Sequence, residues 1–224
     1  MDIGGQSTRP GSNRISIKEE LNRVIPIIKL IIKKYPDQII SIDTYQSEIA
    51  KLACLEGAAI VNDISGGTMD FKMIETVAQL KVPYICMHIK GTPENMQTLS
   101  IYEDVTVDVL KDLAIKVEQC IKAGIKDVII DPGFGFAKNI DQNFKMLSQL
   151  NIFKVLGKPL LAGLSRKSTI YKTLGISAAE SLNGTTCLNT IALLNGADIL
   201  RVHDVKEAAE TIKLVVAFKK AAKN

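Results

Sequence analysis

Short apolar runs alternate along this chain with longer stretches whose apolar residues recur at the helical period. The runs are rich in β-branched residues and nearly continuous, as expected for parallel strands that are covered on both faces. We predict strands at 38–43, 58–62, 82–87, 127–131, 159–163 and 197–202. Helices are predicted around them at 17–34, 45–56, 70–80, 103–123, 141–150, 178–195 and 205–222.

Several helix boundaries carry local signals. Ser16 and Glu19 make an S-x-x-E pattern, which predicts a capping box at the start of the first helix. Pro26 lies inside that helix and predicts a kink. The helix at 103–123 is predicted to bury one stripe, made of Val105, Val109, Leu113, Val117 and Ile121. Glycines are expected to end three helices through positive φ angles, namely Gly57, Gly124 and Gly196.

The repeated strand–helix unit predicts the fold class. Right-handed crossovers in an unbroken series close most simply into a TIM barrel, in which eight parallel strands alternate with helices. An open, doubly wound sheet is the alternative, and the pattern favours the barrel. No linker or composition shift divides the chain, so residues 1–224 are predicted to form a single domain.

Composition narrows the class of ligand. Hydrophobic residues make up 46% of the 224 residues, which is ample for a large core. The net charge is only +4, with no long basic block, which favours an anionic small substrate over nucleic acid. Aromatic residues make up 5% and tryptophan is absent, so a base-stacking surface is not expected.

Cysteine and histidine content adds two further expectations. The four cysteines form no C-x-x-C pair, which favours reduced thiols and a cytoplasmic location. Only two histidines are present, which argues against a multi-histidine metal site. Pro26 and Lys29 interrupt the longest apolar stretch, so no membrane span is predicted.

Polar side chains follow nearly every predicted strand. Asp43 ends one strand, Asn62 ends the next, and Asp131 ends a later one. Further candidates follow other strands, namely Asp2 with the loop 6–9, Asp63, His88 with Lys90, the segment 165–168 and the segment 201–204. One such residue on its own is usually a helix cap. Capping does not explain the whole set, because it does not require the Arg, Lys and His residues found at these strand ends. In a parallel barrel all these positions converge on one rim, which is where such enzymes carry their active sites.

The rim candidates divide by charge. Four cationic side chains suit a phosphate group, namely Arg9, Lys167, Arg201 and His203. Three side chains offer acceptors and an amide to the N–H groups of a flat heterocycle, namely Asp43, Asn62 and Asp131. The loop "DPGFGF" at 131–136 carries Phe134 and Phe136, which could pack against an apolar ring. No Ser-His-Asp order or nucleophilic cysteine indicates covalent catalysis.

Eight segments together carry a specific resemblance. They are "DIGGQSTRPG", "SIDTY", "VNDISGG", "CMHIKGTPENMQ", "DPGFGFAK", "GLSRKS", "NGTT" and "ILRVHDV". In this order and over essentially the whole chain, they resemble the dihydropteroate synthases. The resemblance implies a TIM barrel, usually a homodimer, that joins 4-aminobenzoate to 6-hydroxymethyl-7,8-dihydropterin pyrophosphate. The products are 7,8-dihydropteroate, in folate biosynthesis, and pyrophosphate, with Mg²⁺ as cofactor. Sulfonamides mimic the aminobenzoate in that family.

The resemblance also implies residue roles. The pterin would be held by Asp43, Asn62, Asp131, Gly163, Lys167 and Arg201. Within that set, the catalytic residues would be Asp43, Asp131, Lys167 and Arg201. The pyrophosphate would be bound by Thr8, Arg9, Arg201 and His203. The aminobenzoate would contact Thr8, Phe136 and Ser168.

Two departures from the family pattern matter. Gln6 stands where the family usually has Glu, which we treat as a mild change. The family's first strand and most of its second are expected to be missing, because only "DIG" precedes the first loop. The missing segment would carry the family's Mg²⁺-ligating Asn, so no residue of this chain is predicted to bind the metal. We expect the chain alone to be marginally stable, because two sheet edges are exposed.

Two alternatives remain open at this point. A pterin-dependent corrinoid methyltransferase has a similar barrel, but it needs no clamp for pyrophosphate, so "SRKS" and "RVHDV" argue against it. A catalytically inactive pterin-binding subunit is the other alternative. Turnover of both substrates would distinguish that subunit from a synthase.

Overall fold

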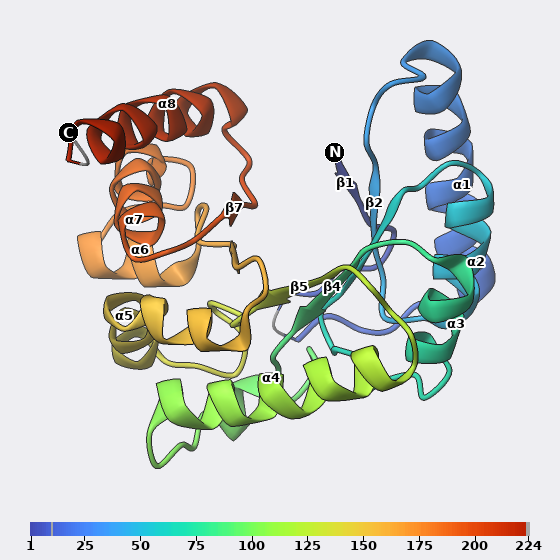
Figure 1. The fold of residues 1–224 in the computed structure, drawn as a ribbon, viewed down its shortest axis with the longest axis horizontal. Coiled ribbons are helices and arrows are strands. Elements are labelled where there is room, and N and C mark those ends of the chain that lie inside the picture. Colours follow the sequence, from blue (N-terminus) through green and yellow to red (C-terminus); the bar gives the residue numbers. More distant parts are fainter. Residues whose placement is uncertain (10, 223–224) are drawn as a thin grey trace.

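The computed structural model describes residues 1–9 and 11–222 and contains a parallel sheet. Five strands pair in chain order, namely β1 (Asp2–Ile3), β2 (Ser41–Asp43), β3 (Ile60–Asp63), β4 (Tyr84–Met87) and β5 (Val128–Asp131). A parallel bridge between Ile130 and Leu160 leads on to β6 (Leu161–Ala162), which pairs with β7 (Ile199–Leu200). The strands therefore follow one another around an arc, as in a TIM barrel (Figure 1).

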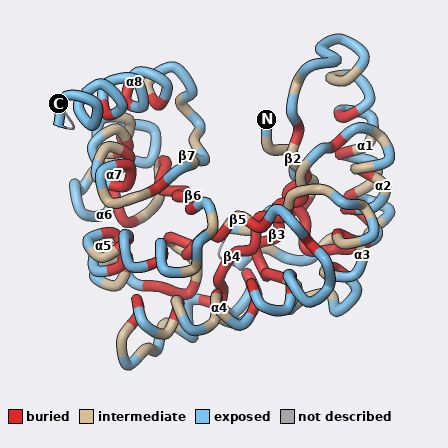
Figure 2. The backbone as a smooth tube through the Cα atoms, viewed as in Figure 1, coloured by how far each residue is buried: buried red, intermediate tan, exposed pale blue. Residues whose placement is uncertain are grey.

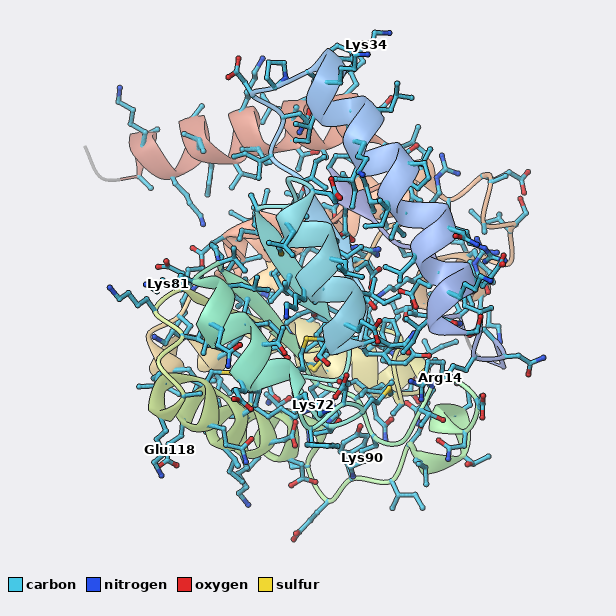
Figure 3. The ribbon with its side chains drawn as sticks, turned by 90° about the vertical axis from the view of Figure 1, so that its right-hand side faces the viewer. Arg14, Lys34, Lys72, Lys81, Lys90 and Glu118 are labelled. Carbon is cyan, nitrogen blue, oxygen red and sulfur yellow. The ribbon has the colours of Figure 1, made fainter. Side chains whose placement is uncertain are left out.

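Helices follow the strands and cover their outer side. They are α1 (Ile17–Lys34), α2 (Ser47–Leu55), α3 (Met73–Leu80), α4 (Val105–Lys122), α5 (Ile140–Ser148), α6 (Ser168–Leu174), α7 (Leu182–Leu194) and α8 (Val205–Ala221). Two 3₁₀ helices lie at Met96–Leu99 and Leu150–Leu156. Figure 3 shows α1, α2 and α3 side by side on this outer layer, with Lys34 at the upper end of α1 and Lys81 at the left edge of the view.

The six predicted strands are all present, and each is shorter than predicted. All seven predicted helices are also present, although the one predicted at 178–195 begins only at Leu182. The sequence pattern missed α6, because seven residues are too few to establish a helical period. It also missed the capping box of α5, in which Asn139 and Gln142 bond reciprocally.

The local signals predicted at the helix ends are confirmed in part. Ser16 accepts a hydrogen bond from the Glu19 amide, so it caps the helix as predicted. The Glu19 side chain pairs instead with Arg23, one turn further on, with a 3.0 Å contact. Helix α1 continues through Pro26, and the kink at this residue stays a prediction. The three glycines predicted to end helices do have positive φ angles, of 113° at Gly57, 94° at Gly124 and 102° at Gly196.

The buried stripe of α4 differs from the prediction at its last position. Val105, Val109, Leu113 and Val117 are buried, but Ile121 is 52% exposed, and Cys120 is buried in its place. A spacing of four residues rotates by about 40° per step on a helix with 3.6 residues per turn, so the fifth position leaves the buried face. The stripe joins one hydrophobic cluster that extends from α1 to the residues before β7, and Figure 2 shows this burial along the strands and the inner helix faces.

The arc of strands is open between its first and last members. Among the described residues, β7 and β1 share no strand pairing, and Figure 1 shows them on either side of an opening. The side chain of Arg201, directly after β7, reaches across and pairs with Asp2 of β1 and Asp43 of β2. In the part of the chain that the structure describes, no helix has the length and apolar character needed to cross a membrane.

Candidate active site

The carboxyl ends of neighbouring strands bring the predicted acceptors together. Asp43 at the end of β2 is in register with Asn62 of β3, and Met87 of β4 is in register with Asp131 of β5. Parallel strands end at the same edge of a sheet, so these side chains share one rim. Asp43, Asn62 and Asp131 are all buried. The predicted convergence of these three residues on one rim is therefore confirmed.

A network of charged and amide groups joins this rim to the last strand. The Arg201 guanidinium donates to Asp2 at 2.5 Å through Nε and to Asp43 at 2.9 Å through an Nη atom. The amide of Asn62 donates to Asp2 at 3.1 Å, and the Ser41 hydroxyl donates to the same carboxylate at 2.5 Å. Asp2 therefore orients both Asn62 and Arg201, a role that sequence analysis did not assign to it.

Asp43 retains an unused acceptor. Its Oδ2 atom takes the bond from Arg201, whereas its buried Oδ1 atom has no partner among the described residues. Burial, together with the neighbouring Asp2 charge, raises the pKa of Asp43 to about 7, and Arg201 only partly opposes this shift. A buried carboxyl oxygen without a partner is costly, so this atom is suited to accept a bond from a ligand N–H.

Asp131 and Lys167 form the second charged group of the rim. Asp131 accepts a hydrogen bond from the Gly133 amide at 2.8 Å. Lys167 donates to the carbonyl of Phe134, and its Nζ atom lies 4.9 Å from the centre of the Phe136 ring. Burial lowers the pKa of Lys167 to about 8, and the Asp131 carboxylate opposes this shift. Burial likewise raises the pKa of Asp131, and Lys167 opposes the shift.

Three of the four predicted cationic residues, Arg9, Arg201 and His203, lie in the loops after β1 and β7, whereas Lys167 follows β6 and interacts with Asp131. Arg9 is exposed, and the Arg201 side chain is 45% exposed. Burial lowers the pKa of His203, and the positive charges of Arg201, Arg166 and Arg9 lower it further. The arginines therefore carry the positive charge of this group, and His203 beside them favours its neutral form, in which a ring N–H can still donate to an anion. The Nδ1 atom of His203 lies 2.9 Å from the Ser165 hydroxyl, which fixes the imidazole ring.

The predicted aminobenzoate residues are less closely joined. Phe136 is half-buried beside Lys167, and Ser168 begins α6 directly after Lys167. Thr8 is half-buried in the loop after β1. Among the described residues, no hydrogen bond connects Thr8, Phe136 and Ser168 to one another. Their common role in binding stays a prediction.

Two residues of the rim have structural partners that sequence analysis missed. Arg166, in "SRKS", makes a two-point ion pair with Asp204 at 2.9 and 2.8 Å, which ties the loop after β6 to the loop after β7. Gln6 is buried, donates to the carbonyls of Ser7 and Asn13, and accepts from the Ile15 amide. Gln6 thus holds the loop that carries Thr8 and Arg9, and its burial was not visible in the sequence.

A cavity of about 490 Å³ lies beside the rim. It is lined by Gln6, Ser12, Arg14, Tyr45, Thr68, Met69 and residues 91–94, and by none of the predicted pterin residues. Figure 3 shows Arg14, which lines this cavity, above and to the right of Lys90, the residue directly before the lining segment 91–94. Among the described residues, no group of three or more His, Cys, Asp or Glu side chains could hold a metal ion.

Comparison with known proteins identifies the family. A family model described as "Pterin binding enzyme" matches residues 1–203. The chain is 45% identical over 223 residues to the dihydropteroate synthase of a Synechocystis species, covering 97% of this chain and 76% of that protein. It is 43% identical to the folic acid synthesis protein of Schizosaccharomyces pombe, of which it spans only 31% while 98% of this chain is covered.

Solved structures agree with these relatives. The Yersinia pestis dihydropteroate synthase, solved with a sulfonamide drug, matches with a TM-score of 0.94 and 36% identity, covering 98% of this chain and 80% of that one. The Clostridium difficile enzyme, solved with pteroic acid, has a TM-score of 0.90 and 35% identity, at 97% and 81% coverage. The Xanthomonas albilineans enzyme, solved with 4-aminobenzoic acid, has a TM-score of 0.89 and 34% identity, at 99% and 78% coverage.

These matches extend over almost the whole chain, and they agree with the α/β barrel fold and with the predicted enzyme class. The chain belongs to the dihydropteroate synthase family of pterin-binding enzymes, which are transferases of folate synthesis.

Proposed function

We propose that this chain joins a dihydropterin pyrophosphate to 4-aminobenzoate, with the rim residues in the roles given below. One observation carries the assignment of these roles. Arg201 is bound by Asp2 and Asp43, and it also lies within electrostatic reach of His203. A single guanidinium thus connects the carboxylates that suit a pterin with the cations that suit its leaving group.

The pterin is proposed to bind at the buried carboxylates. Its ring N–H groups would donate to Asp43, whose Oδ1 atom has no other partner among the described residues, and to Asp131. Asn62 is held in place by Asp2 and would supply an amide to the ring edge. Lys167 and Arg201 would flank the ring near Gly163, where an added Cβ would come within 4 Å of only their own side chains. Negative charge at the ring edge favours a growing positive charge at the pterin methylene.

The leaving group is proposed to bind on the cationic side. As the bond between carbon and oxygen breaks, negative charge grows on the pyrophosphate, and Arg9, Arg201 and His203 would stabilise it. Thr8 would add a hydroxyl donor to the same group. Mg²⁺ stays a proposed cofactor that would neutralise phosphate charge, although the described side chains form no metal-binding group by themselves.

The aminobenzoate is proposed to approach beside Phe136, with its carboxylate at Ser168 and Thr8 nearby. Support comes from the family, because the Xanthomonas enzyme was solved with 4-aminobenzoic acid and the Clostridium enzyme with pteroic acid. The weakly basic aromatic amine would attack the methylene carbon as pyrophosphate departs. It needs no base until late in the reaction, so none of the described residues has to act early as a proton acceptor.

A turnover assay tests this function. The chain is incubated with 6-hydroxymethyl-7,8-dihydropterin pyrophosphate, 4-aminobenzoate and Mg²⁺, and dihydropteroate is measured by chromatography. Formation of dihydropteroate supports the synthase. Tight binding of the pterin pyrophosphate without product would instead support an inactive pterin-binding subunit. The family comparisons favour the synthase over the corrinoid methyltransferase.

Assembly and location are further proposals. We propose a homodimer, supported by apolar side chains that α8 leaves exposed, among them Leu214 and Phe218 one turn apart. Sedimentation analysis would measure the mass of the particle, and a monomer at micromolar concentration would contradict a dimer. A cytoplasmic location is supported by four free cysteines, Cys54, Cys86, Cys120 and Cys187.

A further inference from the structure

Lys138 is a buried lysine that the proposed reaction does not use. It closes the segment "DPGFGFAK", follows β5 in the chain, and is only 3% exposed. Its Nζ atom lies 3.0 Å from the carbonyl oxygen of Gly133, 3.0 Å from that of Phe136, and 3.0 Å from Nδ1 of His88. A lysine this deeply buried requires partners for its nitrogen, and this one has three.

The three contacts satisfy the hydrogen-bonding capacity of the Lys138 nitrogen. An ammonium group donates to both carbonyls and to Nδ1 of a neutral imidazole. A neutral amine donates to both carbonyls and accepts from an Nδ1–H group, so every polar atom is satisfied in either protonation state. Burial lowers the pKa of Lys138 well below its ordinary value, and burial with the Lys138 charge lowers that of His88. His88 therefore faces Lys138 as a neutral ring and is committed to this contact.

Lys138 bonds the carbonyls at the two ends of the loop segment 133–136, and backbone groups of this segment contact Asp131 and Lys167 of the site. The amide of Gly133 donates to Asp131, and the carbonyl of Phe134 accepts from Lys167. Gly133 and Phe136 flank that stretch, and their carbonyls both end on the same nitrogen. His88, the third partner, follows β4, so Lys138 connects the ends of two adjacent strands.

We propose that Lys138 is a positioning residue that holds the loop 131–136 in the shape that places Asp131 and Lys167 for the pterin. This inference rests on the proposed function, because it concerns the same pterin site. Lys138 touches no reacting atom. It acts through the backbone of Gly133 and Phe136, and His88 braces it from the neighbouring strand. Loss of Lys138 is therefore expected to disturb the carboxylate side of the rim and to spare the cationic side, whose residues lie in other loops.

Two ligands and a matched control separate this role from general loss of structure. The variant is Lys138→Met, and the control is Lys116→Met, which removes another buried lysine that bonds the Met87 carbonyl and Asp112. Affinities are measured by calorimetry for 6-hydroxymethylpterin and for inorganic pyrophosphate with Mg²⁺. We expect Lys138→Met to weaken pterin binding about tenfold or more, since small misplacements of site residues are costly. Pyrophosphate binding should change less than about twofold in Lys138→Met. Lys116→Met loses a bond to the Met87 carbonyl next to His88 but none to the loop 131–136, so it should weaken pterin binding less than Lys138→Met does.

A conservative variant provides the rescue. Lys138→Gln keeps two N–H donors for the two carbonyls, so it should recover most of the lost pterin affinity. If Lys138→Met does not fold, the same two affinities are measured for His88→Leu, which removes the contact that braces Lys138 from the end of β4 and should weaken pterin binding selectively. Equal weakening of both ligands, or unchanged pterin affinity, would overturn the positioning role. A wild-type chain that binds pterin but yields no dihydropteroate would count against the proposed function and leave this role standing.

Discussion

The two sides of the rim differ in burial. The carboxylate side consists of Asp43, Asn62 and Asp131, which are 8%, 5% and 7% exposed. The cationic side consists of Arg9, Arg201 and His203, which are all exposed. Groups on the carboxylate side are held by neighbouring backbone and side chains, whereas those of the cationic side reach out from loops. Changes on the first side should therefore affect both fold and ligand, and changes on the second should affect mainly the ligand.

The cause of this difference lies in the sheet. Asp43 ends a strand that is paired on both sides, and Asp131 ends β5, which pairs with β4 and is bridged to Leu160 on its other side, so the sheet and its helices enclose both residues. Arg9 and His203 follow β1 and β7, which border the opening of the arc (Figure 1). Burial perturbs the pKa values of groups on the carboxylate side strongly, because ionised groups are poorly solvated there.

The largest effect is expected for Gly133→Ala, in the loop after β5. Gly133 has a φ of 74°, and an added Cβ would lie 2.1 Å from the carbonyl oxygen of His88. We expect a loss of about 3–5 kcal/mol in the free energy of unfolding, since both strain and a backbone clash arise. Pterin binding should be lost with it. Thermal unfolding and calorimetry measure the two effects.

Gly175→Ala is the matched control for that change. Gly175 has a similar φ of 66°, but nothing lies within 4 Å of an added Cβ. It should cost only about 1 kcal/mol, from backbone strain alone. If both variants lose equal stability, the close approach of Gly133 to β4 contributes nothing, and the carboxylate side is less tightly held than we argue.

The candidate site also shows which features sequence analysis can predict and which it cannot. That Asp43, Asn62 and Asp131 share a rim could be predicted, because the side-chain positions follow from strand ends in a parallel sheet. The burial of Lys138 could not, because lysine is ordinarily exposed and no local pattern marks its three partners. The pairing of Arg201 with Asp2 joins residues 199 positions apart and depends on how far the arc curves.

The secondary-structure predictions are limited in the same way, because they also rest on local patterns in the sequence. Long helices such as α4 were placed from their apolar period, but Ile121 was assigned to the wrong face because the spacing was extended one step too far. The short helix α6 was missed, although it carries Ser168. Local signals thus locate the elements and the strand ends. They do not give the partners of charged groups, which come from different elements.

The second prediction separates binding from stability on the carboxylate side. Gly163 is buried, and an added Cβ would lie 3.7 Å from Nζ of Lys167 and 3.9 Å from Cβ of Arg201, which is ordinary contact. Gly163→Ala should therefore leave the melting temperature nearly unchanged. The methyl group would occupy space proposed for the pterin ring, and overpacking of about 1–3 kcal/mol would weaken binding about 10- to 100-fold. Unchanged pterin affinity would place the ring elsewhere.

The third prediction concerns pH and Asp43. Its pKa is about 7 in the folded chain and near 3.8 when unfolded, so the folded state holds the extra proton between these values. Stability should therefore fall as the pH rises from about 4 to 7, because ionisation is unfavourable in the buried site. Binding of 6-hydroxymethylpterin should instead strengthen, by up to about tenfold per unit below pH 7, since the carboxylate is the better acceptor.

Asp43→Asn tests both halves of that prediction. The variant cannot ionise at this position, so its melting temperature should decline less between pH 4 and 7, with the rest of the decline coming from other buried acids such as Asp131, and its pterin affinity should rise less. Melting curves and calorimetry at pH 5, 6, 7 and 8 give the comparison. If the variant keeps the wild-type pH dependence, another group is responsible, and the burial of Asp43 has no measurable effect on function.

The smallest effect is expected on the cationic side, for Arg9→Gln. Arg9 is exposed in the loop after β1, so its removal should leave the melting temperature unchanged. Pyrophosphate affinity should fall about fivefold at low salt, and the difference should shrink in 1 M salt, where charges are screened within about 3 Å. Lys34→Gln removes the same charge far from the rim, at the end of α1 (Figure 3), and controls for net charge. Equal losses in both variants would mean that the chain attracts pyrophosphate through its overall charge, whereas a loss confined to Arg9→Gln would assign the effect to the loop.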